Sequence, residues 1–251
     1  MDEVTFKWSS KPELSTPTLV EGLPGVGNVG KLAAEHLIDE LKAEKFIDIF
    51  SKHFPPQVLI KEDGTIKLVR NEVYFHRSKD AGDLIILTGD YQGHSPEGQY
   101  VLSDAVLKEL VDYKLKRIYT LGGWSTGRIV DTPRVLGAAT SLDMVKALTD
   151  SGVTSSSGEP GGGIVGAGGL LIGLGNLMGI EGACLMGETS GYFVDPKSAR
   201  SVLEALTKIL GVTISFAQLE EKAKQIEALT SRIKEMEPEQ RGPKDDLGYI
   251  G

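Results

Sequence analysis

Cysteine is almost absent from this chain, which has one thiol, Cys184, among its 251 residues. A single cysteine cannot form an internal disulfide, so a disulfide-stabilised secreted scaffold is excluded. The N-terminal stretch MDEVTFKWSS has no apolar run typical of a signal peptide, and we therefore expect a cytoplasmic protein. Cys184 lies in the apolar run EGACLMGE with no histidine beside it, which favours a core residue over a nucleophile.

Positive charge is also scarce, because 27 Lys and Arg residues stand against 35 Asp and Glu residues and the formal net charge is -8. The sequence has no stripe of basic residues interleaved with aromatic residues, so we expect no nucleic-acid partner. The longest apolar stretch, GGGIVGAGGLLIGLGNLMGI, is about as long as a membrane span but is rich in glycine. This composition favours a tightly packed buried helix, and we expect no membrane association.

A sequence signature of metal binding is missing as well. There is no closely spaced set of His or Asp residues of the kind that holds a metal ion. We predict no catalytic residue, no metal and no cofactor.

The chain does have an alternation of short apolar runs and helical stripes. Runs such as DLIILTGD and RIYTLGG are typical of strands buried on both faces. Strands are expected at residues 4–8, 18–21, 46–50, 57–60, 66–69, 73–76, 83–88, 117–121 and 183–186. Helices are expected at 31–41, 96–113, 141–149, 166–178 and 196–210, the second with Ser95 as its N-cap. This alternation predicts an α/β fold in which a mostly parallel sheet is covered by helices on both faces.

Residues 52–79 interrupt the alternation with consecutive short strands. The sequence EDGT places Asp63 and Gly64 in a hairpin turn, and we expect this segment to be an antiparallel extension of the main sheet. For the whole chain we predict a globular domain over residues 1–215, an amphipathic helix over 216–236 and a flexible tail over 237–251.

The predicted C-terminal helix carries apolar residues with heptad spacing: Phe216, Leu219, Ala223, Ile226 and Ile233. About three heptads are marginal for a solitary helix, so this seam must pack on a partner. The partner is either the parent domain or another subunit. The tail that follows, PEQRGPKDDLGYIG, combines prolines, glycines and charges with apolar residues near its end.

A glycine-rich loop follows the strand expected at residues 18–21. Gly25, Gly27 and Gly30 match the dinucleotide template G-x-G-x-x-G, and the same loop with Lys31 matches the phosphate-binding template G-x-x-x-x-G-K. Neither match is complete. Leu32 follows the lysine where a magnesium ligand is needed, and the acid of the dinucleotide template falls inside the run FIDIF. Two interpretations stay open: a structural turn or protein-contact loop, and an anion-binding loop.

Loops that follow parallel strands lie at one edge of a sheet, where α/β proteins place their sites. Here they are expected at residues 23–28, 90–96, 122–128, 159–163 and 188–192, and they can converge on one crevice. Asp90, Arg128 and Glu188 would then supply acidic and anion-binding groups beside a phosphate on residues 25–31. This gives an alternative function, a small-molecule enzyme or sensor that binds a nucleotide or phosphate.

Four segments occur in order along the chain: VEGLPGVGNVGKLAAEHLI, then GDYQG with PEGQY, then LGGWSTGR, then GETSGYFVDP. Together they resemble the archaeal proteasome-assembly-chaperone homologues over approximately residues 19–217. The resemblance implies a three-layer α/β/α sandwich, similar in architecture to nucleoside phosphorylases and without an established enzymatic activity. It also implies homo-oligomers, tetramers or pentamers, that serve the proteasome core particle as ATP-independent assembly chaperones or activators.

The same resemblance gives the C-terminus a role. Activators of this family that dock on the proteasome α-ring end in a hydrophobic residue, a tyrosine and one further residue. This chain ends in Tyr249, Ile250 and Gly251, so the tyrosine comes one position early and Gly248 precedes it. The predicted docking residues are Leu247, Tyr249, Ile250 and Gly251. A paralogue of this chain is the alternative partner.

Overall fold

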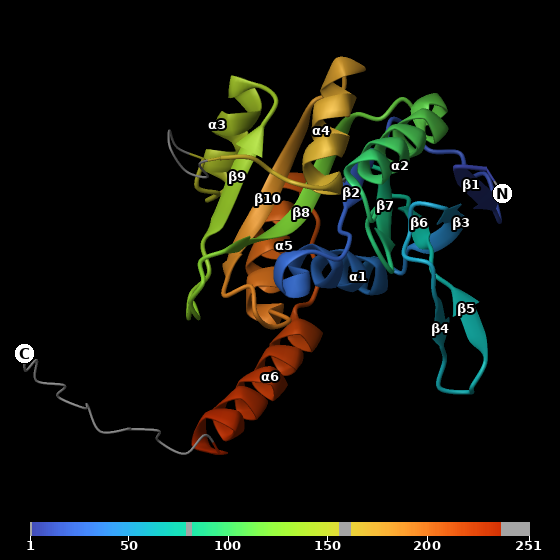
Figure 1. Cartoon of the computed structure of the whole chain (residues 1–251). Coiled ribbons are helices and arrows are strands. Elements are labelled where there is room, and N and C mark those ends of the chain that lie inside the picture. Colours follow the sequence, from blue (N-terminus) through green and yellow to red (C-terminus); the bar gives the residue numbers. More distant parts are fainter. Residues whose placement is uncertain (1, 79–81, 156–161, 237–251) are drawn as a thin grey trace, which may run out of the picture.

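The computed structural model (Figure 1) describes residues 2–78, 82–155 and 162–236. Eight strands form its central sheet: β1 (Val4–Trp8), β2 (Thr18–Glu21), β3 (Glu44–Ser51), β6 (Asn71–His76), β7 (Leu84–Gly89), β8 (Arg117–Ser125), β9 (Val135–Ala139) and β10 (Gly182–Thr189). Their order across the sheet is β1-β3-β6-β7-β2-β8-β10-β9. β3, β7, β2, β8 and β10 run in one direction, and β1, β6 and β9 run in the other. The neighbouring parallel strands β7, β2, β8 and β10 therefore form the middle of the sheet.

Helices cover both faces of this sheet (Figure 1). They are α1 (Val29–Leu41), α2 (Pro96–Glu109), α3 (Leu142–Asp150), α4 (Ala167–Leu177), α5 (Pro196–Leu210) and α6 (Ala217–Met236), with short 3-10 helices η1 (Val26–Asn28) and η2 (Val111–Tyr113). α1, α3 and α5 share one buried core with Val20 and Leu185, while α2 and α4 share the other with Leu19 and Ile118. The predicted α/β fold with a mostly parallel, doubly covered sheet is confirmed.

Part of the glycine-rich apolar stretch forms α4, a helix as expected, but only one face of this helix is buried and Leu177 is 83% exposed. A methyl group on Gly175 would lie 2.5 Å from Cδ1 of Ile118, so glycine lets the helix approach β8 closely. Within the described ranges, no helix combines the length and the apolar character that a membrane crossing requires.

Proline and aspartate explain why one predicted strand pair lies outside the main sheet. β4 (Val58–Ile60) and β5 (Ile66–Leu68) form a separate two-stranded sheet, so the expected extension of the main sheet was wrong for these two strands. β6, from the same segment, lies antiparallel between β3 and β7 in the main sheet, as expected. Pro55 and Pro56 precede β4, and a proline lacks the N–H that continued pairing beyond β3 requires. The Asp63 carboxylate accepts the Thr65 N–H at 2.9 Å and holds the turn. Figure 1 shows this hairpin projecting from the body.

One strand of the sheet, β9, was not predicted. Its sequence VLGAA is short and contains glycine and alanine, which are poor strand formers. Tertiary pairing decides its conformation, because it lies antiparallel to β10 at the edge of the sheet. A methyl group on Gly137 would lie 2.6 Å from Cγ1 of Val153, so the glycine leaves room for the loop after α3.

Candidate functional site

The glycine loop connects the carboxyl end of β2 to α1. A methyl group on Gly30 would overlap the carbonyl oxygen of Leu121 in β8, and one on Gly22 would overlap the carbonyl oxygen of Gly30. Gly27 has a φ of 62°, in the left-handed region that glycine adopts without strain. These glycines allow α1 to begin in direct backbone contact with the sheet.

The ammonium group of Lys31 has two partners within the protein. Its Nζ donates to the carbonyl oxygen of Gly89 at 2.9 Å and lies 3.5 Å from the carboxylate of Glu35. The ammonium group thus joins α1 to the end of β7. Anion binding by Gly25, Gly27, Gly30 and Lys31 stays a prediction, and the structure shows another partner for the only charged member of this set.

A cavity of about 380 Å³ lies beside the loop. It is lined by Glu21, Leu23, Gly25, Val26, Gln92, Leu121, Gly122, Gly123, Trp124, Ser125, Gly163, Ile164, Val165, Gly168, Cys184 and Met186. The loops after β2, β7 and β8 therefore converge at the carboxyl ends of the parallel strands. Of the predicted loop 159–163, residues 162 and 163 lie within the described part. The volume falls in the range of about 300–1,000 Å³ that is typical of small-molecule pockets.

Glu21 is the buried acid of this cavity. The residue is 2% exposed, and its Oε1 accepts the N–H of Leu23 at 2.9 Å. Its Oε2 is buried and has no hydrogen-bond partner. Burial raises the pKa of Glu21 to about 7, against the lowering effect of the Leu23 N–H. The carboxyl group therefore exchanges its proton near neutral pH.

Glu21, Thr120 and Cys184 form a row across three neighbouring parallel strands, because they are register partners in β2, β8 and β10. The Thr120 hydroxyl donates to the carbonyl oxygen of Gly168 in α4 at 3.0 Å. Burial raises the pKa of the Cys184 thiol to about 12, so this thiol is protonated at neutral pH and is a poor nucleophile.

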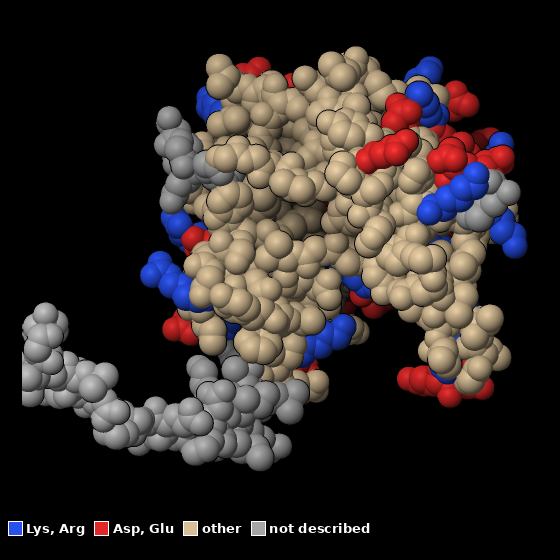
Figure 2. Space-filling model, viewed as in Figure 1, with Lys and Arg blue, Asp and Glu red and all other residues tan. Residues whose placement is uncertain are grey.

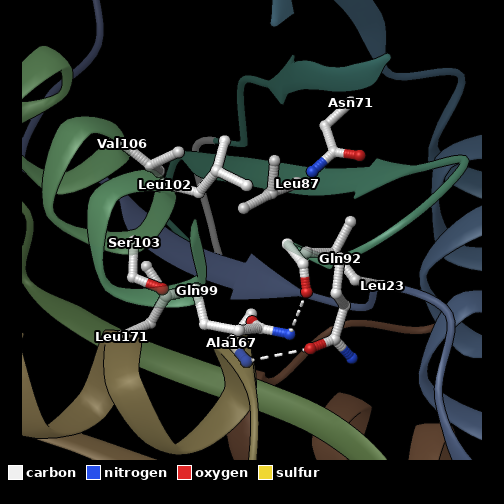
Figure 3. Close-up of a pocket in the computed structure, with 11 residues that line it drawn as sticks. Leu23, Asn71, Leu87, Gln92, Gln99, Leu102, Ser103, Val106, Ala167 and Leu171 are labelled. Atoms are coloured by element: carbon white, nitrogen blue, oxygen red, sulfur yellow. Dashed lines mark hydrogen bonds between the residues drawn. The ribbon is translucent and has the colours of Figure 1, made fainter. Parts of the chain in front are cut away.

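Gln92 connects the glycine loop to α4. Its Nε2 donates to the carbonyl oxygen of Pro24 at 2.8 Å, and its Oε1 accepts the N–H of Ala167 at 3.0 Å. Figure 3 shows this amide between Leu23 and the start of α4, beside a second void of about 20 Å³. The second void is too small for a ligand larger than a water molecule.

The acidic and basic residues that the sequence predicted for the crevice lie elsewhere. Asp90 is paired with Lys67 at 3.1 Å, and Glu188 accepts from Nε of Arg134 at 3.0 Å. The hydrogen bond from Arg134 is the main cause of the lowered pKa of Glu188. Arg128 is exposed. None of these residues lines the 380 Å³ cavity.

Glu21 and Gln92 line the cavity, and sequence reasoning missed both. The available signal was Glu21 itself, a charged residue that follows Leu19 and Val20 in the strand TLVE, because acids are almost never fully buried without a partner. Among the residues that the structure describes, no group of three or more His, Cys, Asp or Glu side chains is placed to hold a metal ion.

The heptad helix α6 packs on the parent domain at its beginning. Leu219 is 1% exposed and belongs to the core that α1 and α5 share. The ring of Phe216, just before the helix, stacks on His36 with centroids 6.2 Å apart, and the Arg200 guanidinium lies 5.9 Å from its centroid. Ala223 lines a groove against the start of α5. Of the two possible partners, the parent domain therefore holds the first turns.

The remaining seam and tail residues are only partly covered by the structure. Ile226 is half-buried, and Ile233 belongs to the segment of α6 for which the helix backbone alone is described. Figure 1 shows α6 leaving the body after its first turns. The predicted docking residues Leu247, Tyr249, Ile250 and Gly251 lie outside the described residues.

Known proteins match this chain over almost its full length. The crystal structure of Pyrococcus furiosus PbaB, an archaeal proteasome activator, has a TM-score of 0.89 at 41% identity and covers 93% of this chain and 100% of its own. Pyrococcus furiosus PbaA, an archaeal homolog of proteasome-assembly chaperone, has a TM-score of 0.77 at 30% identity over 93% of this chain and 92% of its own.

A curated relative from Methanocaldococcus jannaschii, the protein MJ1210, is 42% identical over 99% of this chain and 97% of its own length. The model of the PAC2 family matches residues 19–234, which run from the buried strand β2 through most of α6. With that span, and with the same fold in PbaA and PbaB, the chain belongs to the PAC2 family.

Proposed function

We infer that this chain is a non-enzymatic, ATP-independent chaperone or activator that binds the proteasome core particle. The observation that carries the proposal is the likeness to PbaB, whose structure is that of an archaeal proteasome activator and matches 93% of this chain at a TM-score of 0.89.

A homo-oligomer is part of this proposal, and the hairpin β4–β5 supports it. Val58 pairs with Leu68 and Ile60 pairs with Ile66, so the hairpin carries four aliphatic residues in cross-strand pairs. All four are exposed, Ile60 by 79%. An isolated two-stranded hairpin is marginally stable in water, and an exposed aliphatic face of this kind is typical of an interface. A second copy of the chain is the occupant that we propose.

The C-terminal tail is the proposed docking element for the α-ring. Tyr249 offers an aromatic anchor and Gly251 the terminal carboxylate, which are the groups that a pocket between subunits can capture. An oligomer presents several tails together, and linked weak contacts gain avidity without any new contact.

Binding to purified core particles tests the proposal. We compare the full chain with a chain that ends at Leu247, and the variant Tyr249→Ala with Tyr192→Ala, the same change at a tyrosine that is exposed in the body. We expect the full chain and Tyr192→Ala to bind and to change peptide hydrolysis, and the other two to bind at least tenfold more weakly. Failure of the full chain to bind would contradict the proposed function.

A further inference from the structure

The cavity beside the glycine loop has a definite chemical character. None of its lining residues is Lys, Arg or His, and Leu23, Trp124 and Ile164 give it apolar walls. The face seen in Figure 2 agrees with this, because its centre is largely uncharged and charged side chains gather near β1, β3 and α2. Val165, which is 95% exposed, marks where the lining reaches the surface. An anionic ligand would find no counter-charge here.

The polar side chains that line the cavity differ in whether their hydrogen-bonding atoms already have partners in the protein. Both ends of the Gln92 amide already hold backbone partners, Pro24 and Ala167. Oε2 of Glu21 has none, although it is buried. A buried carboxyl oxygen without a partner costs stability and becomes favourable when a ligand donates a hydrogen bond to it.

We propose that this cavity binds a small planar molecule, uncharged or cationic, that donates N–H groups to Glu21, as an amidine or an amino-heterocycle does. The ring of the ligand lies against Trp124 and Ile164, and its N–H donates to Oε2. Above the pKa of Glu21, at about pH 8, the group is a carboxylate that only accepts hydrogen bonds, and it therefore selects an N–H donor. This site lies in the body of the protein and does not depend on proteasome binding.

A substitution at Gly168 tests the same oxygen, Oε2 of Glu21, without changing the carboxyl group itself. A methyl group at this position would lie 3.7 Å from Oε2 of Glu21 and 3.5 Å from Oγ1 of Thr120, which are ordinary contact distances. Gly168→Ala should therefore fold normally and place a methyl group beside Oε2, where the ligand donates. Gly173→Ala, in the same helix, is the matched control, because a methyl group at that position would have nothing within 4 Å.

Calorimetric titration of the full chain with 2-aminobenzimidazole at about pH 8, where Glu21 is ionised, tests the proposal, with 2-methylbenzimidazole and benzoate as matched probes. We expect a Kd on the order of 1 mM or tighter for the amino compound, about tenfold weaker binding of the methyl compound, and no binding of benzoate. Of the two tryptophan indole resonances, that of Trp124 should shift and that of Trp8, which is bonded to Glu109, should not.

Glu21→Gln decides the role of the carboxyl group. If the amide oxygen keeps the Leu23 hydrogen bond, an N–H₂ group replaces Oε2 and faces the donor of the ligand, so affinity should fall about tenfold or more. Gly168→Ala should weaken binding as well, and Gly173→Ala should not. No binding of the amino compound to the full chain, or equal affinity for Glu21→Gln, Gly168→Ala and the unaltered protein, would overturn the proposal.

Discussion

Gly30 lets the start of α1 lie directly against β8, because any side chain there would overlap the Leu121 carbonyl oxygen. We expect Gly30→Ala to lower the free energy of unfolding by about 3 kcal/mol, since a methyl group against backbone cannot be accommodated by a rotamer change. Gly173→Ala, with free space around the new methyl group, should raise it by up to about 1 kcal/mol. Chemical denaturation of both variants measures these changes, and equal effects would refute this reason for the glycine.

Glu21 should make stability depend on pH in an unusual direction. Its pKa rises from 4.5 to about 7 on folding because of burial, so between these values the folded chain binds more protons than the unfolded chain. The free energy of unfolding should therefore fall as pH rises from about 4.5 to 7, by about 3 kcal/mol relative to Glu21→Gln. Denaturation at several pH values measures the difference between the two proteins.

Glu188 provides the opposite case. Its pKa is lowered, first by the hydrogen bond from Arg134, so its contribution to stability is present above its unfolded pKa and is lost as the pH falls. Glu188→Gln should therefore be less stable than the unaltered protein at neutral pH, and its free energy of unfolding should approach that of the unaltered protein in acid.

For Glu21, the outcome that would contradict the prediction is a constant difference in free energy of unfolding between the unaltered protein and Glu21→Gln across pH 4.5 to 7. Such a result would show that Glu21 titrates normally.

Residue-level prediction from the sequence succeeded where local chemistry decides the outcome. Ser95 caps α2 by accepting the Gly98 N–H at 3.1 Å, as expected from serine followed by proline. The prediction for Asp90 and Glu188 failed, because an ion pair with Lys67 or Arg134 depends on neighbours that are distant in sequence. The burial of Glu21 likewise depends on α4, which follows it by more than a hundred residues.

The docking of α6 is the clearest prediction at the scale of elements. Leu219 is buried in the core, and its truncation to alanine should lower the free energy of unfolding by about 3 kcal/mol. Leu177→Ala makes the same change at an exposed position and should alter stability by about 0.5 kcal/mol at most. Urea denaturation compares the two variants, and a small effect at Leu219 would mean that α6 does not hold to the body.

Elements with strong local patterns were predictable, and elements decided by pairing were not. α2 and α5 carry apolar stripes and begin at clear N-caps, Ser95 and Asp195, and the buried strands β7 and β8 appear as continuous apolar runs. β9 forms because β10 offers it a partner, and β4–β5 leaves the main sheet because two prolines end the pairing. Neither outcome is encoded in the strand sequence alone.

Assembly is the first prediction at the scale of the whole molecule. Lysines at positions 60 and 66, introduced by Ile60→Lys and Ile66→Lys, would place two like charges in the exposed aliphatic pair of the hairpin. In light scattering we expect a lower mass for this double variant than for the unaltered protein. Leu142→Lys, a change at an exposed aliphatic residue outside the hairpin, should keep the mass of the unaltered protein. An unchanged mass of the double variant would show that the hairpin is not part of an interface between copies of the chain.

At the scale of the whole molecule, the prediction of function came from four sequence motifs that occur in order along the chain, and not from composition or periodicity. The segments in and after β2, β7, β8 and β10 carried the resemblance, and the loops after β2, β7 and β8 converge at the cavity. The family match over residues 19–234 agrees with them. The tail differs from the activator pattern in its last three residues, so its role must be measured directly.

Native mass spectrometry of the full chain mixed with purified proteasome core particles tests the central claim most directly. We expect a complex whose mass equals the core particle plus several copies of this chain, and we expect its loss with the chain that ends at Leu247. Separate masses for the core particle and for this chain, at concentrations that exceed the micromolar range, would contradict the account.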